Sequence, residues 1–448
     1  MSSLPMILPP DSVPAGLVRE SQLLHHYAAD DLDPGLTPAS WRNVLHAPTT
    51  LRAGSAWAVS ANGRVYRTPA DLPRFEWYDL DGDGILETPT LVVEDAETNL
   101  CPHSDFLTQW TVNFSATASV HDTVGETQMY RVDDIDATNA SYLSKTLSGF
   151  TGATAKGVVV VWGRGTISAA SGAWLRMRSI TGGVDLLNAT VVANADGSPA
   201  PSIVGGAGTY QGARYLLTVA GVRYYALYFS TNSVTVAHTH EARLGAAVTG
   251  SQQGNVYWGS ITITDDLRTA SVIDRGGVGS VSRAREVVGW LAPYVTTGAQ
   301  SWSVDFLEVG ASATSGSVLA ALSDANGAAP SLAVTVNASG RYTVTHNNGL
   351  VSVLSAAQST PAFLSRVRLL VWLFDDGSVQ IGQSVNGGAI VMGTRSAANT
   401  PGIAWGVAAS TSGFYLQPAA GFVKAKTRLL GWKVSGGTLT DTKLLNRW

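Results

Sequence analysis

Residues 366–388 read RVRLLVWLFDDGSVQIGQSVNGG, and this stretch decides the fold class. Two apolar, strand-like runs lie on either side of Asp375, Asp376, Gly377 and Ser378. β-Branched and aromatic residues favour strands, and an Asp-Gly step between two such runs favours a tight turn. The stretch therefore predicts a β-hairpin.

The same pattern recurs along most of the chain. Runs rich in Val, Ile, Thr and aromatic residues, separated by Asn-Gly, Asp-Gly or Gly-Gly turns, lie at 157–165, 215–230, 256–266, 301–310, 331–349 and 422–437. Only residues 12–28 and the terminal TDTKLLNRW could carry helical turns. Short strands at roughly 8–12-residue spacing are typical of β-sandwiches and jelly rolls. We therefore predict an all-β fold.

The chain divides into two blocks of similar size. At 448 residues it is too long for one ordinary core, since a domain averages about 150 residues. Each block closes on an aromatic-rich strand pair, NVYWGSITITDD in the first and RLLGWKVSGGTLTD in the second. We predict a jelly-roll domain at 96–270 and a second β-sandwich at 271–448. Residues 1–95 are richer in proline and charge, so we expect an N-terminal arm and a small β-hairpin adaptor that attaches to another protein.

The charge balance excludes some partners. Lys and Arg total 29, Asp and Glu total 33, and no dense Lys/Arg run occurs. Phosphate binding needs a concentrated positive surface, so we expect no nucleic-acid partner. Charged residues make up 14% of the chain, against roughly 25% in an average globular protein. This composition favours a durable extracellular or particle-bound protein over a cytosolic enzyme.

The sequence also predicts how the protein is placed in the cell. The single cysteine, Cys101, cannot form an internal disulfide. The stretch MSSLPMILPPDSVPAG lacks the basic and uninterrupted apolar regions of a signal peptide. No segment offers the ~20 consecutive apolar residues of a membrane span. We therefore expect no membrane insertion, and exit from the cell by particle assembly or lysis.

Residues 60–110 carry short motifs in a fixed order. An Asn-Gly-Arg-Val turn precedes a Pro-Arg-Phe step, a Leu-Val-Val-Glu run and a Thr-Asn-Leu step. The matching pieces are Asn62 to Val65, Ala70 to Phe75, Leu91 to Glu94, Thr98 to Leu100, Ser104, Phe106 and Trp110. The series resembles a segment common in tail and other virion proteins of bacteriophages and prophages. Glu97 departs from the pattern, because family members usually carry Arg before Thr-Asn-Leu.

This resemblance implies a virion component, and it leaves tail fibre, tail tip and head decoration open. In the family the segment usually precedes a carbohydrate-binding-like jelly roll. Residues 429–434 and 439–444 are also similar to the closing strands of concanavalin-like or laminin-G-like sandwiches. The second block is therefore expected to take that form.

The stretch WYDLDGDGILET at 77–88 predicts either a calcium loop or a tight turn. Its acidic residues stand at positions 1, 3, 5 and 9 of a calcium-loop pattern, and Ca²⁺ takes six to eight oxygen ligands. The candidate ligands are Asp79, Asp81, Asp83, Glu87 and the carbonyl of Ile85. The twelfth position is Thr90 and the flanks read as strands, which excludes an EF-hand.

The alternative is a Gly-containing turn whose aspartates cap backbone amides. A bound ion would stiffen the adaptor and take no part in catalysis.

Aromatic residues near the end of the first block suggest a glycan site. Sugars stack on flat rings and bond to nearby polar groups. The candidates are Tyr224, Tyr228, Tyr257 and Trp258. Alternation in RYYALYF puts Tyr224 and Tyr228 on one strand face, and that face is a ligand platform, a subunit contact or core.

No catalytic constellation stands out. Asp305 with Glu308, or Asp375 with Asp376, could form the carboxylate pair of a glycosidase, but strand and turn positions explain them more simply. His238 and His240 lie on one strand face and could bind a transition metal, but without a cysteine or further histidines nearby the pattern favours ordinary exposed or hydrogen-bonded strand residues. We therefore predict a protein that is not an enzyme.

Three functions remain open at this stage. The favoured one is a non-enzymatic structural component of a tailed-phage virion that binds other virion proteins through residues 1–95 and forms a homo-oligomer. The second is a receptor-binding protein that recognises a host-surface glycan. The third is a glycan depolymerase.

Overall fold

The computed structural model describes residues 23–28, 49–94, 96–104, 107–124, 127–147, 150, 153–167, 172–246, 253–265, 281–284, 286–291, 300–308, 317–324, 332–336, 342–346, 351–353, 361–374, 376–398, 412–416 and 427–436. The elements within these ranges are strands, apart from one short 3-10 helix at Leu107–Gln109. The prediction of an all-β fold is confirmed. No helix in the described ranges has the length and apolarity needed to cross a membrane.

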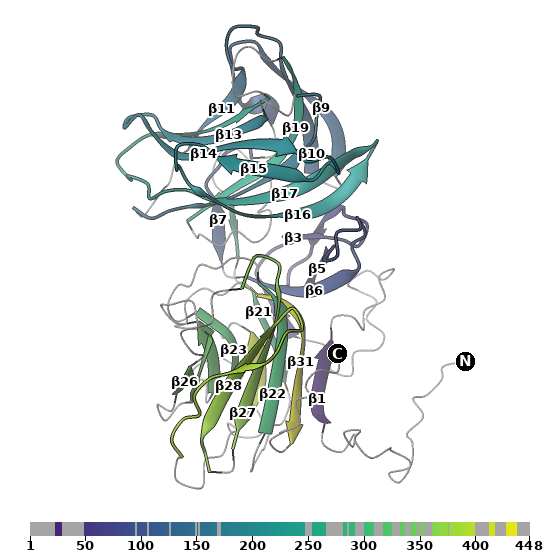
Figure 1. The fold of residues 1–448 in the computed structure, drawn as a ribbon, viewed down its shortest axis with the longest axis vertical. Coiled ribbons are helices and arrows are strands. Elements are labelled where there is room, and N and C mark those ends of the chain that lie inside the picture. Colours follow the sequence, from purple (N-terminus) through teal and green to yellow (C-terminus); the bar gives the residue numbers. More distant parts are fainter. Residues whose placement is uncertain are drawn as a thin grey trace, which may run out of the picture.

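The first sandwich consists of two six-stranded antiparallel sheets (Figure 1). Its strands are β8 (Thr111–Asn113), β9 (Ala116–Val124), β10 (Thr127–Asp134), β11 (Tyr142–Leu147), β12 (Gly157–Gly163), β13 (Ala173–Ser179), β14 (Val184–Ala193), β15 (Pro199–Ile203), β16 (Thr209–Val219), β17 (Val222–Ser230), β18 (His240–Gly245) and β19 (Gly254–Thr264). One sheet runs β16-β17-β12-β19-β10-β9 and the other β15-β14-β13-β18-β11-β8. Apolar side chains from both sheets meet in one core, which contains Val160, Leu175 and Trp258. All twelve strands lie within 96–270.

The central strands β12 and β17 of the β16–β9 sheet are buried on both of their faces. Successive strand residues point to opposite faces, and in β12 Val158 and Val160 enter the core between the sheets while Val159 and Val161 point outward. The outward residues are covered by a hairpin of β3 (Ala56–Val59) and β4 (Val65–Thr68), which contributes Trp57 to a second core. This double burial explains why β12 reads GVVVVWG without polar alternation.

The second sandwich also draws on two sheets. Its strands are β1 (Leu23–Ala28), β2 (Thr49–Leu51), β5 (Arg74–Tyr78), β6 (Thr88–Val93), β21 (Val287–Leu291), β22 (Gln300–Leu307), β23 (Ser317–Asp324), β24 (Leu332–Val336), β25 (Tyr342–His346), β26 (Val351–Val353), β27 (Arg366–Leu373), β28 (Val379–Val385), β29 (Val391–Met392), β30 (Ser412–Leu416) and β31 (Thr427–Gly436). One sheet runs β29-β28-β27-β22-β31-β6-β5, with β1 also paired to β31, and the other runs β2-β21-β30-β23-β24-β25-β26. The hairpin predicted at 366–388 is β27 and β28.

Strands from residues 1–95 are built into the second sandwich. β5 and β6 continue its first sheet beyond β31, β1 pairs with β31, and β2 pairs with β21. Figure 1 shows β3, β5 and β6 lying between the two sandwiches. The helical turns predicted over 12–28 are wrong for 23–28, because backbone pairing with β31 holds these residues as a strand. Residues 12–22 and the terminal TDTKLLNRW lie outside the described residues.

A short two-stranded ladder completes the link between the sandwiches. β7 (Glu97–Asn99) pairs with β20 (Val281–Arg283), so the start of the first block lies beside the start of the second. Asn99 accepts hydrogen bonds from the amides of Cys101 (3.0 Å) and Ile263 (3.1 Å) and donates one to the carbonyl of Ile261 (3.2 Å). This side chain therefore attaches the β7 segment to β19 of the first sandwich.

Candidate functional site

The acidic loop, residues 79–87, joins β5 to β6 and folds around its own aspartates. Asp79 accepts hydrogen bonds from the amides of Gly82 (2.6 Å) and Gly84 (2.9 Å). Gly82 and Gly84 have φ values of 84° and 87°, a backbone region that favours glycine. Asp83 accepts a hydrogen bond from the amide of Ile85 at 2.7 Å. The aspartates therefore cap backbone amides, as one of the two sequence interpretations expects.

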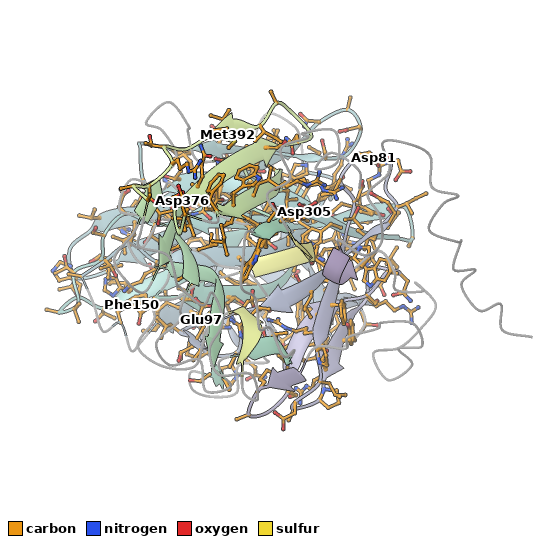
Figure 2. The ribbon with its side chains drawn as sticks, turned by 90° about the horizontal axis from the view of Figure 1, so that it is seen from below. Asp81, Glu97, Phe150, Asp305, Asp376 and Met392 are labelled. Atoms are coloured by element: carbon orange, nitrogen blue, oxygen red, sulfur yellow. The ribbon has the colours of Figure 1, made fainter. Side chains whose placement is uncertain are left out.

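The same loop brings its four carboxylates together. One oxygen from each of Asp79, Asp81, Asp83 and Glu87 lies within 4.8 Å of the others. Asp81, Asp83 and Glu87 are exposed and Asp79 is half-buried, and Figure 2 shows Asp81 at the periphery of the molecule. Like charges this close repel one another, and a cation among them would remove that repulsion. The arrangement could hold a metal ion. Amide capping and metal binding are therefore compatible here.

The aromatic residues predicted as a glycan platform do not form an exposed surface. Tyr224, Tyr228 and Trp258 are 0%, 3% and 0% exposed. The ring centroids of Tyr228 and Phe363 are 4.8 Å apart, and Phe363 belongs to the second block. Tyr257 is half-buried and stacks on His121 with ring centroids 4.3 Å apart. Both faces of RYYALYF are core, because the β3–β4 hairpin covers the outer one.

The carboxylates considered for glycoside cleavage are engaged elsewhere. Asp305 is paired with Arg368 (2.8 Å) and Arg366 (3.2 Å). Glu308 accepts a hydrogen bond from the Tyr342 hydroxyl at 2.7 Å.

Asp376 is engaged in the β27–β28 turn. It accepts hydrogen bonds from Ser378 and from Arg395, and these lower the pKa of Asp376 to about 2. Asp375 lies outside the described residues.

The two histidines of β18 and its preceding turn do not converge on one point. Their ring centroids are 6.5 Å apart. Nδ1 of His238 lies 2.8 Å from the Ser179 hydroxyl. Burial lowers the pKa of His240, and His238 and Lys156 add to this effect.

A buried set of charges, here called the junction cluster, was not foreseen from the sequence. It consists of three arginines and three glutamates whose side chains are at most 3% exposed, namely Arg52, Arg74, Arg283, Glu94, Glu97 and Glu286. Glu286 accepts from Arg52 at 2.7 Å and from Arg74 at 2.7 and 3.0 Å. Glu94 pairs with Arg74 and Arg283, each at 2.5 Å. Buried charges require such pairing.

The junction cluster connects three parts of the chain. Arg52 directly follows β2. Arg74 lies on β5 and Glu94 directly follows β6, while Arg283 and Glu286 come from the residues that lead into the second sandwich. The backbone amide of Glu94 also donates to Glu286 at 3.0 Å. Glu97 pairs with Arg283 at 3.4 Å, so the position at which this chain departs from the phage pattern still forms an ion pair.

A second buried ion pair connects β5 to the first sandwich. Arg214 on β16 pairs with Glu76 at 3.0 Å and donates to the carbonyl of Trp77 at 2.6 Å. Its guanidinium lies over the Tyr78 ring, 3.9 Å from the centroid. The charge on Arg214 is therefore balanced by groups of the preceding segment.

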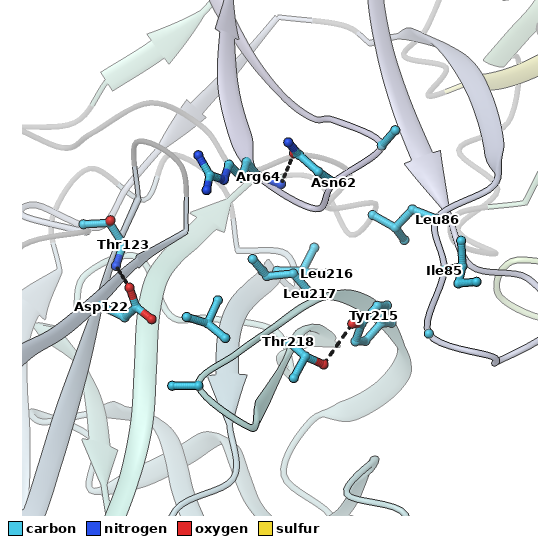
Figure 3. A pocket seen from close by; sticks show the side chains of 14 residues that line it. Asn62, Arg64, Ile85, Leu86, Asp122, Thr123, Tyr215, Leu216, Leu217 and Thr218 are labelled. Carbon is cyan, nitrogen blue, oxygen red and sulfur yellow. Dashed lines mark hydrogen bonds between the residues drawn. The ribbon is translucent and has the colours of Figure 1, made fainter. Parts of the chain in front are cut away.

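A cavity of about 770 Å³ lies next to the Glu76–Arg214 contact, since the lining includes Tyr215 and Leu216, the two residues after Arg214. Four segments of the chain supply the residues that line the cavity, namely the β3–β4 turn, the acidic loop, β9 and the end of β16 (Figure 3). Its polar members are Asn62, Arg64, Asp122, Thr123, Tyr215 and Thr218. Nothing in the sequence pattern indicated this cavity, since its lining residues are far apart along the chain.

Comparison with known proteins gives no identification. No protein-family model matches the sequence, and no curated protein matches it significantly.

Proposed function

We propose that this protein is a non-enzymatic structural component of a tailed-phage particle, attached to other particle proteins through residues 1–95 and displaying its two sandwiches. The observation that carries the proposal is the position of the segment that resembles phage virion proteins. Its Arg74 and Glu94 belong to the junction cluster, which ties β5 and β6 to the residues that lead into the second sandwich. Its Glu76 pairs with Arg214 of the first sandwich. That segment thus has a mechanical use in this chain, which is to attach the second sandwich to the first.

A rigid joint suits a projecting particle protein. Breaking a buried ion pair costs about 3–5 kcal/mol, so a hinge motion that separates Glu76 from Arg214 is strongly disfavoured. The aromatic contact between Tyr228 and Phe363 and the packing of Trp57 and Trp77 on the outer face of the first sandwich add further attachments. A protein that must hold its two sandwiches at a fixed spacing gains from all of these contacts.

The proposal includes calcium in the acidic loop. Ca²⁺ favours carboxylate oxygens and tolerates irregular geometry, whereas Mg²⁺ demands a near-ideal octahedron. Four carboxylates within 4.8 Å of one another suit the larger ion. Bound there, it would stiffen the connection between β5 and β6 and take no part in a reaction.

Particles released from the cell that carries the gene would test the structural role. Mass spectrometry of gradient-purified particles should detect this chain at a fixed ratio to the major particle proteins. Immunogold labelling should place it at one location on each particle, and cross-links to other particle proteins should map to residues 1–95. Recovery of the chain only in the soluble lysate would refute the proposal.

A further inference from the structure

The cavity beside the junction has the size and construction of a ligand site. Its volume of about 770 Å³ lies within the range of ~300–1,000 Å³ typical of small-molecule sites, which often form where structural units meet. One side consists of Asn62 and Arg64 from the β3–β4 turn, and another of Gly84, Ile85 and Leu86 from the acidic loop. The end of β16 and residues of β9 complete it (Figure 3).

Close backbone packing holds these walls in place. Gly63 has a φ of 75°, and a Cβ at this position would lie 2.1 Å from the carbonyl oxygen of Leu216. The β3–β4 turn can therefore rest directly on β16 only because residue 63 is glycine. Leu216 and Leu217, the residues at this contact, also line the cavity. The walls are thus set before any ligand arrives.

The polar groups around the cavity are of several kinds. Arg64 and Asn62 are exposed on one side, and Asp122 and Thr123 come from β9 on another. Tyr215 is half-buried, and its hydroxyl lies 3.0 Å from that of Thr218. A guanidinium, a carboxylate, an amide and hydroxyls together with a partly exposed ring match a ligand with many hydroxyl groups and apolar ring faces.

The charged residues around the cavity favour a neutral sugar over an acidic one. The acidic loop forms one wall and holds four carboxylates, while Arg64 is the single basic residue among those that line the cavity. A bound divalent ion would cancel two of these four negative charges and leave the acidic loop net negative, so the loop would still repel an acidic sugar but not a neutral one. We propose that this cavity binds a neutral oligosaccharide. The inference goes beyond the structural role and is tested separately from it.

An array of oligosaccharides tests the proposal. The full chain is applied to printed neutral glycans (glucans, mannans, galactans and N-acetylhexosamine polymers) and acidic glycans (uronic and sialic acid polymers). We expect binding to at least one neutral glycan, with Arg64→Ala and Asp122→Ala each raising its Kd at least tenfold in calorimetric titration. Arg164→Ala, at an exposed arginine outside the cavity lining, is the control and should leave Kd unchanged.

The array and the titrations can either support or overturn oligosaccharide binding at this cavity. A neutral hit that both cavity variants weaken, while circular dichroism shows unchanged folding, supports the assignment. The absence of a neutral hit, binding to acidic glycans alone, or a neutral hit with equal Kd in Arg64→Ala, Asp122→Ala and the parent chain would overturn it. None of these results bears on whether the chain is found in particles.

Discussion

Glu286 is the residue on which the junction cluster depends most. It accepts hydrogen bonds from both Arg52 and Arg74, and its side chain is 1% exposed. Glu286→Gln keeps the shape but leaves those arginines with less negative charge in a site that water does not reach. We expect the free energy of unfolding to fall by about 3–5 kcal/mol, measured by urea denaturation.

The matched control is Arg131→Gln, in the exposed Arg131–Asp133 pair of β10. Exposed pairs contribute about 0–1 kcal/mol, so this variant should unfold almost as the parent does. Equal stability of Glu286→Gln and Arg131→Gln would contradict the importance given to the junction cluster.

Cys101 offers a chemical test of burial. It is 0% exposed, and burial raises the pKa of its thiol. Only the thiolate reacts with iodoacetamide, so at pH 8 the folded protein should remain unmodified while guanidinium-unfolded protein is fully alkylated. Intact-mass spectrometry over a time course measures this. Rapid alkylation of the folded chain would show that the β7–β19 contact opens readily.

Single residues show where sequence reasoning reaches its limit. The Asp-x-Asp-x-Asp spacing indicated that Asp79, Asp81 and Asp83 would lie together, because their separation along the chain is short. No such spacing connects Arg52 with Glu286, which are brought together by the packing of distant strands. The run YYALYF has no polar residue on either face, and an uninterrupted apolar run is typical of a strand buried on both faces. The alternation argument, which assigns one face to the core, overlooked this indication of double burial.

The acidic loop is the element whose metal binding is easiest to measure. Tb³⁺ is a hard ion that replaces Ca²⁺, and Trp77, two residues before Asp79, can sensitise its emission. We expect sensitised emission from the parent chain, competition by Ca²⁺, and a large loss in Asp81→Asn. At about 100 times Kd, free calcium should stabilise the fold by roughly 2.7 kcal/mol.

Asp133→Asn serves as the control for the acidic loop, because Asp133 pairs with Arg131 on β10 and belongs to no carboxylate group of this kind within the described residues. Emission equal in the parent and Asp81→Asn would place Tb³⁺ elsewhere. Absence of sensitised emission from the parent would argue that the loop is only a capped turn.

Among the elements, the strands with the strongest patterns were the predictable ones. The runs at 157–165, 256–266 and 366–388 correspond to β12, β19 and the β27–β28 hairpin. The pairing of β5 and β6 with β31 was not predictable, because sequence patterns give the face of a strand but not its partner in the sheet. The assignment of 23–28 to a helical turn failed for the same reason.

At the scale of the whole molecule, residues 49–93 belong to both sandwiches. β5 and β6 extend a sheet of the second, while Trp57, Trp77 and Leu86 cover the outer face of the first. The sequence suggested an arm and adaptor at 1–95, separate from both sandwiches. The structure differs for residues 49–93, because the central strands of the β16–β9 sheet carry an apolar outer face that these residues cover.

This shared cover leads to a prediction about truncation. A chain of residues 96–448 would expose the outward face that holds Val159, Val161 and Tyr228, and would leave Glu286 without Arg52 and Arg74. We expect it to bind the dye ANS and to aggregate in size-exclusion chromatography with light scattering. A chain of residues 23–448 keeps every described strand and should behave as the full chain does. If 96–448 stayed monodisperse and bound no dye, the first sandwich would need no cover, and the segment before it would be an attached arm rather than a shared part of both folds.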